Sequence, residues 1–285
     1  MKNNPQVAIM MPVYNGQQTL PLAISSLLYQ TYPYWKCYIV NDGSTDGTKN
    51  YLNSLNDDRF VVIHFEKNRG RPYARQAALD AAEGKYLAFL DADDFYHPTK
   101  LQLQVNYLEI NKNISLVGTG VGSYKNVYDG LLSVRATISK QNISHSIGDR
   151  FYVVHGSCFL ILDLAKKIKY NTKLKHAQDT DFLTKYLKDR KYSNIDKVLY
   201  YYSEFQSVTL SKIIRTYYYD FLQKKTNLNK VTLSVKSIII FAKVIYTLLI
   251  YLVFGMNTVL KRRGRAINEF ELMEFKKCLH LLKKI

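Results

Sequence analysis

The chain has 285 residues, enough to bury a sizeable core in one large α/β domain with an appendage. Hydrophobic residues make up 47% of the sequence and charged residues 22%, which excludes a disordered or fibrous chain. The formal net charge is +17. A charge of that size indicates an anionic partner, such as nucleic acid, anionic lipid or a phosphorylated substrate, or else a solvated basic surface.

The three cysteines, Cys37, Cys158 and Cys278, are scattered along the chain. They show neither metal-ligand spacing nor a paired framework, which favours a reducing compartment. The N-terminal segment carries one lysine and a short apolar run broken by Pro12 and Asn15, so it does not resemble a signal peptide. We therefore expect a cytosolic location.

Short apolar runs alternate with helical patterns over the first hundred residues. Strands are expected at Val7–Val13, Lys36–Val40, Phe60–Phe65 and Tyr86–Leu90. Helices are expected at Thr19–Tyr29, Thr45–Leu55, Tyr73–Ala82 and from Pro98 to about Ile110. This alternation predicts an α/β fold with a mostly parallel sheet covered on both faces, and ligands beyond the carboxyl ends of the strands.

The second part of the chain has a different pattern. Residues 114–161 are mixed, Thr180–Leu187 has helical periodicity, and Val198–Tyr202 has the pattern of a short strand. After about residue 210 the apolar content rises and acidic residues almost vanish. These changes predict a domain over residues 1–210, with halves 1–113 and 114–210, followed by a helical tail over residues 211–285.

The strongest chemical signal is the run Leu90-Asp91-Ala92-Asp93-Asp94 at the end of a predicted strand. Three carboxylates in four residues repel one another unless a cation or several donors compensate them. A Mg²⁺ or Mn²⁺ ion that holds a diphosphate takes one or two carboxylates together with phosphate oxygens. The alternative is a turn and helix N-cap ahead of Pro98.

Two further motifs follow strand ends. Asp42, in the turn Asn41-Asp42-Gly43-Ser44, is placed to accept a hydrogen bond from a nucleobase imide, although such βα turns are common. Tyr14 follows the first strand after Pro12-Val13 and could stack on a base or be an exposed turn residue.

Two charged motifs lie at predicted helix starts. Arg71 and Arg75 follow Asn68-Arg69-Gly70 and suit bidentate contact with phosphate, or form a solvated basic face. Asp179 lies in His176-Ala177-Gln178-Asp179-Thr180-Asp181, where the helix dipole by itself favours acidic residues.

The order and spacing of the five motifs resemble the family 2 glycosyltransferases, which have the GT-A fold. The resemblance covers about residues 6–205 and does not reach the tail. The matching segments are Met11-Pro12-Val13-Tyr14-Asn15, Val40-Asn41-Asp42-Gly43-Ser44-Thr45-Asp46, Asn68-Arg69-Gly70, Asp91-Ala92-Asp93-Asp94 and Gln178-Asp179-Thr180-Asp181-Phe182.

The resemblance implies a nucleotide-sugar site that includes Pro12, in which Asp42 binds the uracil of a UDP-sugar and Tyr14 stacks beside it. Asp93, helped by Asp91, would hold Mn²⁺ or Mg²⁺ on the diphosphate.

The remaining implied roles belong to charged residues. Arg71 would face the phosphates or the donor sugar, with Arg75 as the alternative. Asp179 matches the catalytic base, with Gln178 standing where the family motif usually has Glu. The implied reaction is a single displacement that inverts the anomeric carbon and transfers the sugar to a glycan or lipid-linked acceptor in bacterial surface-polysaccharide synthesis.

The tail indicates an anionic membrane surface. Ile238–Leu260 is almost wholly apolar and could just cross a hydrocarbon core of about 30 Å. The basic run Lys261–Arg265 follows. The apolar residues beyond it recur at helical spacing with lysines between them, which predicts a basic amphipathic helix in the membrane interface. They are Phe275, Cys278, Leu279, Leu282 and Ile285.

A span through 238–260 would place the basic run and the donor-binding domain on opposite sides, although both favour the cytosol. We therefore expect a peripheral or in-plane tail on the cytoplasmic side of the membrane. A single span, packing on the main domain and packing on a second subunit in a homo-oligomer stay open. Because every motif precedes residue 185, the sequence also predicts that a chain ending near Lys230 stays folded.

Three other functions compete. A nucleic-acid binder accounts for the charge but not for three carboxylates at a strand end, so we expect no nucleic-acid partner. A nucleotidyltransferase also uses an α/β sheet, acidic residues and a metal, but would release pyrophosphate. A non-catalytic scaffold would bind the nucleotide sugar without turnover.

Overall fold

The computed structural model describes residues 4–128, 130–137, 143–144, 152–174, 177–204, 209–225 and 230–283. Its strands are β1 (Val7–Val13), β2 (Trp35–Asn41), β3 (Phe60–His64), β4 (Tyr86–Phe89), β5 (Phe95–Tyr96), β6 (Leu116–Tyr124), β7 (Leu131–Arg135), β8 (Ile143–Ser144), β9 (Phe159–Ile161) and β10 (Lys191–Ser203). Its helices are α1 (Leu20–Leu28), α2 (Thr48–Asn53), α3 (Arg71–Ala81), α4 (Lys100–Ile110), the short 3₁₀ helix η1 (His155–Ser157), α5 (Leu162–Ala165), α6 (Gln178–Leu187), α7 (Leu210–Lys225), α8 (Lys230–Lys261) and α9 (Glu269–Leu282).

The strands form one mixed sheet with the order β3-β2-β1-β4-β9-β6-β10-β5, in which β7 pairs with β6 and β8 with β10. The first four strands of this order run parallel. In the second half, β10 is parallel to β6, whereas β9, β5, β7 and β8 pair antiparallel. The elements expected in the first hundred residues are confirmed with small shifts at their ends. The strand expected at Val198–Tyr202 is the end of the longer β10.

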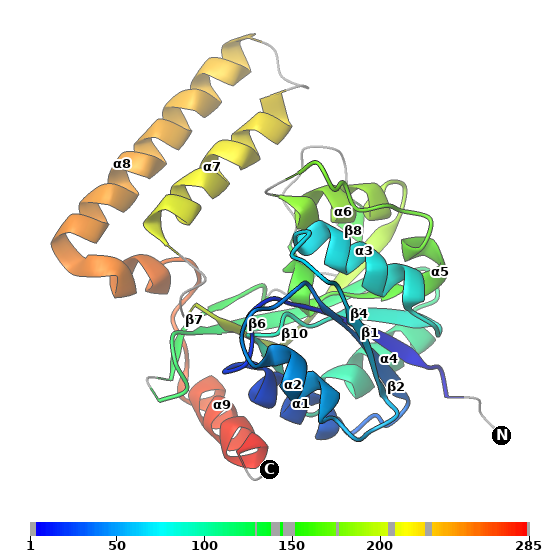
Figure 1. Ribbon diagram of the computed structural model, residues 1–285. Coiled ribbons are helices and arrows are strands. Elements are labelled where there is room, and N and C mark those ends of the chain that lie inside the picture. The colour runs from blue at the N-terminus through cyan, green and yellow to red at the C-terminus, as the bar shows by residue number, and fades with distance from the viewer. Residues whose placement is uncertain are drawn as a thin grey trace.

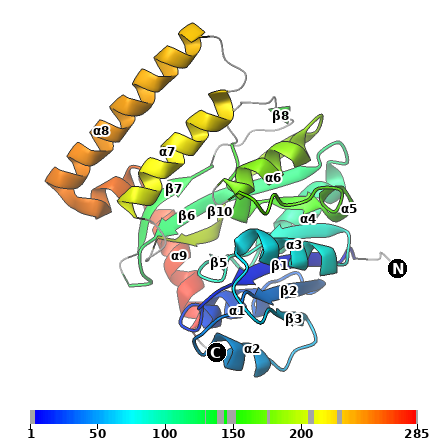
Figure 2. The ribbon, with the colours of Figure 1, turned by 45° about the horizontal axis from the view of Figure 1, so that its top comes forward.

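Alternating residues of β1 explain why helices cover both faces of the sheet (Figures 1 and 2). Ile9 and Met11 belong to one apolar cluster, which includes residues of α1, α2 and α4. Ala8 and Met10 belong to a second cluster, which includes residues of α3, α5 and α6. Because successive side chains of a strand point to opposite faces, a continuous apolar run is the signature of such a doubly covered strand.

Helices α7 and α8 form a hairpin that projects from the sheet (Figure 1, yellow and orange). Ile213 of α7 is buried with Ile250 and Val259 of α8. Within α8, the segment Ser237–Lys261 is long and apolar enough to cross a membrane by length and composition. Gly255 interrupts the helix at a φ of 74°, a conformation that L side chains rarely adopt.

The expectation that the last helix lies in a membrane interface is wrong. Its apolar residues Phe275, Cys278, Leu279 and Leu282 are buried against residues of β5, β6, β7 and β10. The hydroxyl of Ser25 in α1 donates to the carbonyl oxygen of Leu282 at 2.8 Å. Ile285 and Lys284 lie outside the described residues. Because α9 completes the core of the main domain, the expectation that a chain ending near Lys230 stays folded is not supported by this packing.

The basic run ahead of α9 also makes contacts within the protein. Arg263 forms an ion pair with Glu204, whose side chain is fully buried. Arg265 pairs with Glu271 through Nη1 at 3.0 Å, and its backbone N–H donates to the carbonyl oxygen of Val134 at 2.9 Å. The Arg263 side chain and the Arg265 backbone therefore hold this segment against the main domain.

Candidate active site

A cavity of about 670 Å³ opens at the carboxyl ends of β1, β2 and β4. The residues predicted to bind the nucleotide sugar all line it: Pro12, Tyr14, Asp42, Arg71, Asp91 and Asp93. They come from four separate segments of the sequence. The fold thus places them around one space large enough for a nucleotide sugar, because cofactor and ligand pockets are about 300–1,000 Å³.

Hydrogen bonds between two loops fix the wall that carries Tyr14. Asn15 takes a φ of 51°, which asparagine tolerates better than most residues. Its side-chain oxygen accepts from the backbone N–H of Thr45 at 2.9 Å. The backbone N–H of Gly16 donates to Oγ1 of Thr48 at 2.8 Å. The Tyr14 side chain remains half exposed beside this rigid wall.

Asp42 holds the next loop in place. Its carboxylate is buried and accepts from the backbone N–H of Arg69 at 2.7 Å and from that of Gly70 at 2.9 Å. Gly70 has a φ of 95°, which a residue with a Cβ would rarely adopt. Each carboxylate oxygen has a further lone pair, so Asp42 can also accept a hydrogen bond from a ligand.

The three carboxylates after β4 occupy different environments. Asp94 is buried and accepts from the backbone N–H of Ser203 at 2.7 Å and from the Tyr200 hydroxyl. Burial and then the charge of Asp93 raise its pKa well above the usual range. Asp94 is therefore a structural residue that fastens this loop to the end of β10, whereas Asp91 and Asp93 face the cavity.

Asp91 and Asp93 fit a divalent cation. Burial and then the charge of Asp91 raise the pKa of Asp93 to about 6. Burial also raises that of Asp91, but Arg75 and then Arg71 outweigh it and hold the pKa at about 2. A hard cation would compensate Asp93, and carboxylate oxygens are its preferred ligands. No cluster of three or more His, Cys, Asp or Glu suited to a metal occurs among the described residues, so substrate phosphates would have to complete the coordination.

Asp179 lies outside the cavity lining but is connected to it by Arg75. The buried Arg75 guanidinium donates through Nη2 to Oδ1 of Asp91 at 3.1 Å and through Nη1 to Oδ1 of Asp179. The Asp179 side chain is 41% exposed, which leaves its second oxygen accessible. Ala177, in a left-handed conformation, is the N-cap of α6, whose first two residues are Gln178 and Asp179. His176, the first residue of this motif, lies outside the described residues.

His155 completes the surroundings of Asp179. Its Nδ1 lies 3.9 Å from Asp179 Oδ1, and its ring packs on Phe89 with centroids 4.1 Å apart. Burial and then the charge of Arg75 lower the pKa of His155 well below its usual range, so the imidazole is neutral. The neutral ring therefore adds no positive charge beside Asp179.

Several residues of the cavity lining were not predicted from the sequence, and two of them come from beyond residue 200. Lys212, in the first turn of α7, and Ser203, at the end of β10, both line the cavity. The charge of Lys212 also lowers the pKa of the nearby Asp93. Lys212 lies beyond the expected domain boundary, where the sequence shows no motif, so only the return of α7 to the cavity reveals it.

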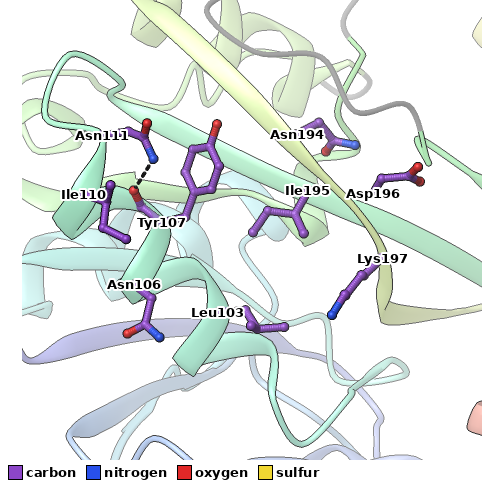
Figure 3. A pocket seen from close by; sticks show the side chains of 9 residues that line it. All are labelled: Leu103, Asn106, Tyr107, Ile110, Asn111, Asn194, Ile195, Asp196 and Lys197. Atoms are coloured by element: carbon purple, nitrogen blue, oxygen red, sulfur yellow. Dashed lines mark hydrogen bonds between the residues drawn. The ribbon is translucent and has the colours of Figure 1, made fainter.

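A second, smaller pocket of about 350 Å³ lies between α4 and β10 (Figure 3). It is lined by Tyr107, Ile110, Asn194, Ile195 and Lys197, among others. None of the predicted site residues contributes to it. The carboxyl-end cavity is therefore the candidate active site.

A family model described as glycosyl transferase family 2 matches residues 8–167, more than half of the chain. The chain belongs to glycosyl transferase family 2. The matched residues include every predicted donor-site residue, whereas Asp179 and Lys212 lie beyond them.

A curated relative is the UDP-Glc:alpha-D-GlcNAc-diphosphoundecaprenol beta-1,3-glucosyltransferase WfgD of Escherichia coli. It is 36% identical over 138 residues, which cover 44% of this chain and 54% of WfgD. The chain spans about half the length of the curated relatives it matches.

Two solved structures share the fold over nearly the whole chain. One is Staphylococcus aureus TarS 1–349 in complex with UDP-GlcNAc, with a TM-score of 0.62 and 18% identity, covering 97% of this chain and 80% of that one. The other is the mannosyltransferase PcManGT of Pyrobaculum calidifontis in complex with GDP-Man and Mn²⁺, with a TM-score of 0.61 and 17% identity, covering 99% and 86%. The predicted GT-A fold is confirmed.

Proposed function

We propose that the protein transfers a sugar from a UDP-sugar to a hydroxyl group of a lipid-linked glycan, with inversion at the anomeric carbon. The observation that carries the proposal is one cavity whose lining joins the residues proposed for a base-binding end to those proposed for a phosphate-binding end. Tyr14 and Asp42 form the first end, and Arg71, Asp91 and Asp93 form the second.

The base-binding end suits uracil. Tyr14 offers an exposed ring for stacking, and its backbone is fixed by the loop contacts of Asn15. The free lone pairs of Asp42 accept the imide N–H of uracil. A cytosine ring has an acceptor in place of the imide N–H, so the carboxylate favours a uridine donor over a cytidine donor.

The phosphate-binding end is where charge accumulates. Asp93 and Asp91 would hold Mn²⁺ or Mg²⁺, which supplies positive charge to the departing diphosphate. Arg71 lines the same end and contributes a fixed guanidinium, and Lys212 adds a second cation from α7. Arg75, which donates to both Asp91 and Asp179, connects this end of the cavity to Asp179.

Asp179 acts as the general base in this proposal. Its accessible oxygen removes the proton from the acceptor hydroxyl while the oxygen of that hydroxyl attacks the anomeric carbon. The bond between the anomeric carbon and the diphosphate breaks as the new glycosidic bond forms, and UDP leaves. Because attack and departure occur on opposite faces, one displacement inverts the configuration.

The names of relatives support the acceptor class. WfgD is named for transfer from UDP-Glc to a GlcNAc diphosphoundecaprenol, a lipid-linked acceptor. The solved TarS complex contains UDP-GlcNAc, and the PcManGT complex contains Mn²⁺. A lipid-linked acceptor requires a membrane-associated enzyme, here working on the cytoplasmic face, where UDP-sugars are made.

The test is turnover of the full chain with a panel of UDP-sugars and undecaprenyl-diphosphate-linked acceptors, with and without Mn²⁺. We expect UDP release that depends on the acceptor and the metal, and a product whose anomeric configuration by NMR is opposite to that of the donor. Release of pyrophosphate would instead identify a nucleotidyltransferase. Binding of UDP without turnover of any donor would identify a nucleotide-sugar-binding scaffold.

A further inference from the structure

The α7–α8 hairpin exposes a continuous apolar surface on the side of α8 that faces away from α7. Five residues of α8 recur at helical spacing and are 42–76% exposed. They form what we call the outer stripe: Ile238, Phe241, Ile245, Leu249 and Leu252. The residues between them, Ile239, Tyr246 and Val253, are also exposed. An exposed apolar patch of this extent marks a site of association.

The opposite face of α8 is already occupied by α7. Ile250 and Val259 of α8 are buried with Ile213, and Tyr217 and Met256 pack against them. The sequence of α7 is much more polar than that of α8, with Lys212, Arg215, Asp220, Lys224 and Lys225 among its sixteen residues. A helix with five charged residues does not accompany α8 into a hydrocarbon core.

Both ends of the hairpin are attached to the same region of the main domain. The hairpin begins shortly after β10, where Glu204 follows the cavity residue Ser203. It ends where Arg263 pairs with the same Glu204 and Arg265 joins the edge strand β7 through Val134. A span of α8 would therefore have to pull the polar α7 across the membrane as well.

The kink at Gly255 also shortens the straight apolar helix. From Ile238 to Phe254 it is about 17 residues, or roughly 26 Å, which is less than the core of about 30 Å. Length, the polarity of α7 and the shared attachment all favour a helix that lies flat on the bilayer over one that crosses it.

Charge distinguishes a lipid surface from a second copy of the chain. Residues 230–261 contain the lysines Lys230, Lys236, Lys243 and Lys261 and no acidic residue. Two copies packed on each other through α8 would bring two purely basic helices together, whereas an anionic bilayer attracts such a helix. Lys243 and Lys261 are exposed, so they can reach lipid headgroups.

We propose that the outer stripe of α8 is a monotopic membrane-binding surface that lies in the plane of an anionic bilayer. Because α7 packs along the inner side of α8 and places Lys212 in the donor cavity, this orientation holds the cavity close to the membrane surface. This inference rests on the proposed function and deepens it, because the acceptor proposed there is lipid-linked.

The first test measures binding of the full chain to phosphatidylglycerol-containing vesicles by flotation. Phe241→Asp and Leu252→Asp each place a carboxylate in the outer stripe and should weaken binding about tenfold or more. The matched control is Ile110→Asp, which changes an equally exposed isoleucine of α4 on the main domain and should leave binding unchanged. Circular dichroism and UDP binding verify that each variant is folded.

The second test measures how deeply two positions of α8 lie in the bilayer. Ile238→Trp and Leu249→Trp are quenched separately by lipids brominated near the headgroup and near the chain end. An in-plane helix gives both tryptophans the same shallow depth. A spanning helix would place Leu249→Trp about 16 Å deeper along its axis than Ile238→Trp. The native Trp35 is buried in the main domain and contributes an equal background to both variants.

Three results would overturn the proposal. The stripe variants could bind vesicles as tightly as the control, or the two tryptophans could differ in depth. Sedimentation without lipid could also show a dimer that Leu252→Asp dissociates, which would make the stripe a subunit interface. None of these readouts uses a donor sugar. A protein that binds vesicles but releases no UDP would support the membrane-binding surface and contradict the proposed function.

Discussion

Asp91 and Asp179, from the donor cavity and from the start of α6, share one counter-ion. The guanidinium of Arg75 donates to Oδ1 of each carboxylate and is almost fully buried. One planar group thus fixes the distance between the predicted metal ligand and the predicted base. In the proposed reaction, this geometry aligns the donor diphosphate with the acceptor hydroxyl.

Arg75→Lys tests this arrangement. A lysine keeps the charge, but a single ammonium group cannot reproduce two donors in a fixed plane. We expect kcat to fall by about 10²-fold while the dissociation constant of UDP changes little. Steady-state kinetics and calorimetry separate the two effects. Arg59→Lys, at a distant ion pair with Asp57, is the control. An unchanged kcat would show that Arg75 has no positioning role.

Asp179→Asn tests the base. An amide cannot accept the proton of the acceptor hydroxyl, so turnover should fall about 10²-fold or more. Donor binding should persist, because Asp179 does not line the donor cavity. The measurement is kcat beside the affinity for the UDP-sugar. A collapse of donor affinity with a folded protein would make Asp179 a donor-binding or structural residue.

Phe275→Ala tests whether α9 belongs to the main domain. Phe275 is fully buried and its ring lies near those of Phe95, Tyr124 and Tyr201. Its truncation should lower the free energy of unfolding by about 3–5 kcal/mol. Phe270→Ala, on the exposed side of the same helix, should change it by about 0.5 kcal/mol or less. Urea unfolding of both variants decides the matter, and equal effects would contradict the observed packing.

The buried Lys100 predicts how the free energy of unfolding depends on pH. Burial lowers the pKa of Lys100 to about 7 in the folded protein, whereas an unfolded lysine has a pKa of about 10.4. Between these values only the unfolded state binds the proton, so this group makes folding more favourable as pH rises. Relative to Lys100→Met, the wild type should gain on the order of 1 kcal/mol per pH unit between about pH 7 and 9.5. Urea unfolding across this range measures the difference, and a flat difference would contradict the buried neutral lysine.

The first hundred residues could be predicted well because their patterns are local. The continuous apolar run Val7–Val13 indicates a strand covered on both faces, and the polar residues Tyr14, Asp42 and Asp91 follow strand ends. Parallel topology then brings such ends together. This rule, together with the resemblance to the family 2 glycosyltransferases, allowed residues from four segments to be assigned to one site before any contact was known.

Long-range contacts account for what the sequence did not reveal. The spacing of Phe275, Cys278 and Leu279 describes an amphipathic helix but not its partner, and a protein core satisfies the same pattern as a membrane. Likewise, Arg263 in a basic run is indistinguishable from a lipid-facing cation until its ion pair with Glu204 is seen. The place of Arg75 between two carboxylates depends on the approach of α6 to α3, which no local motif encodes.

The most direct measurement is calorimetry of UDP binding to the wild type and to Asp93→Asn, with and without Mn²⁺. Asp93 lines the cavity beside Asp91 and is the carboxylate that a cation would compensate. The account predicts that Mn²⁺ tightens UDP binding to the wild type by at least about tenfold, and that Asp93→Asn removes this gain while remaining folded. A folded Asp93→Asn protein that binds UDP with the same affinity and the same dependence on Mn²⁺ as the wild type would contradict it.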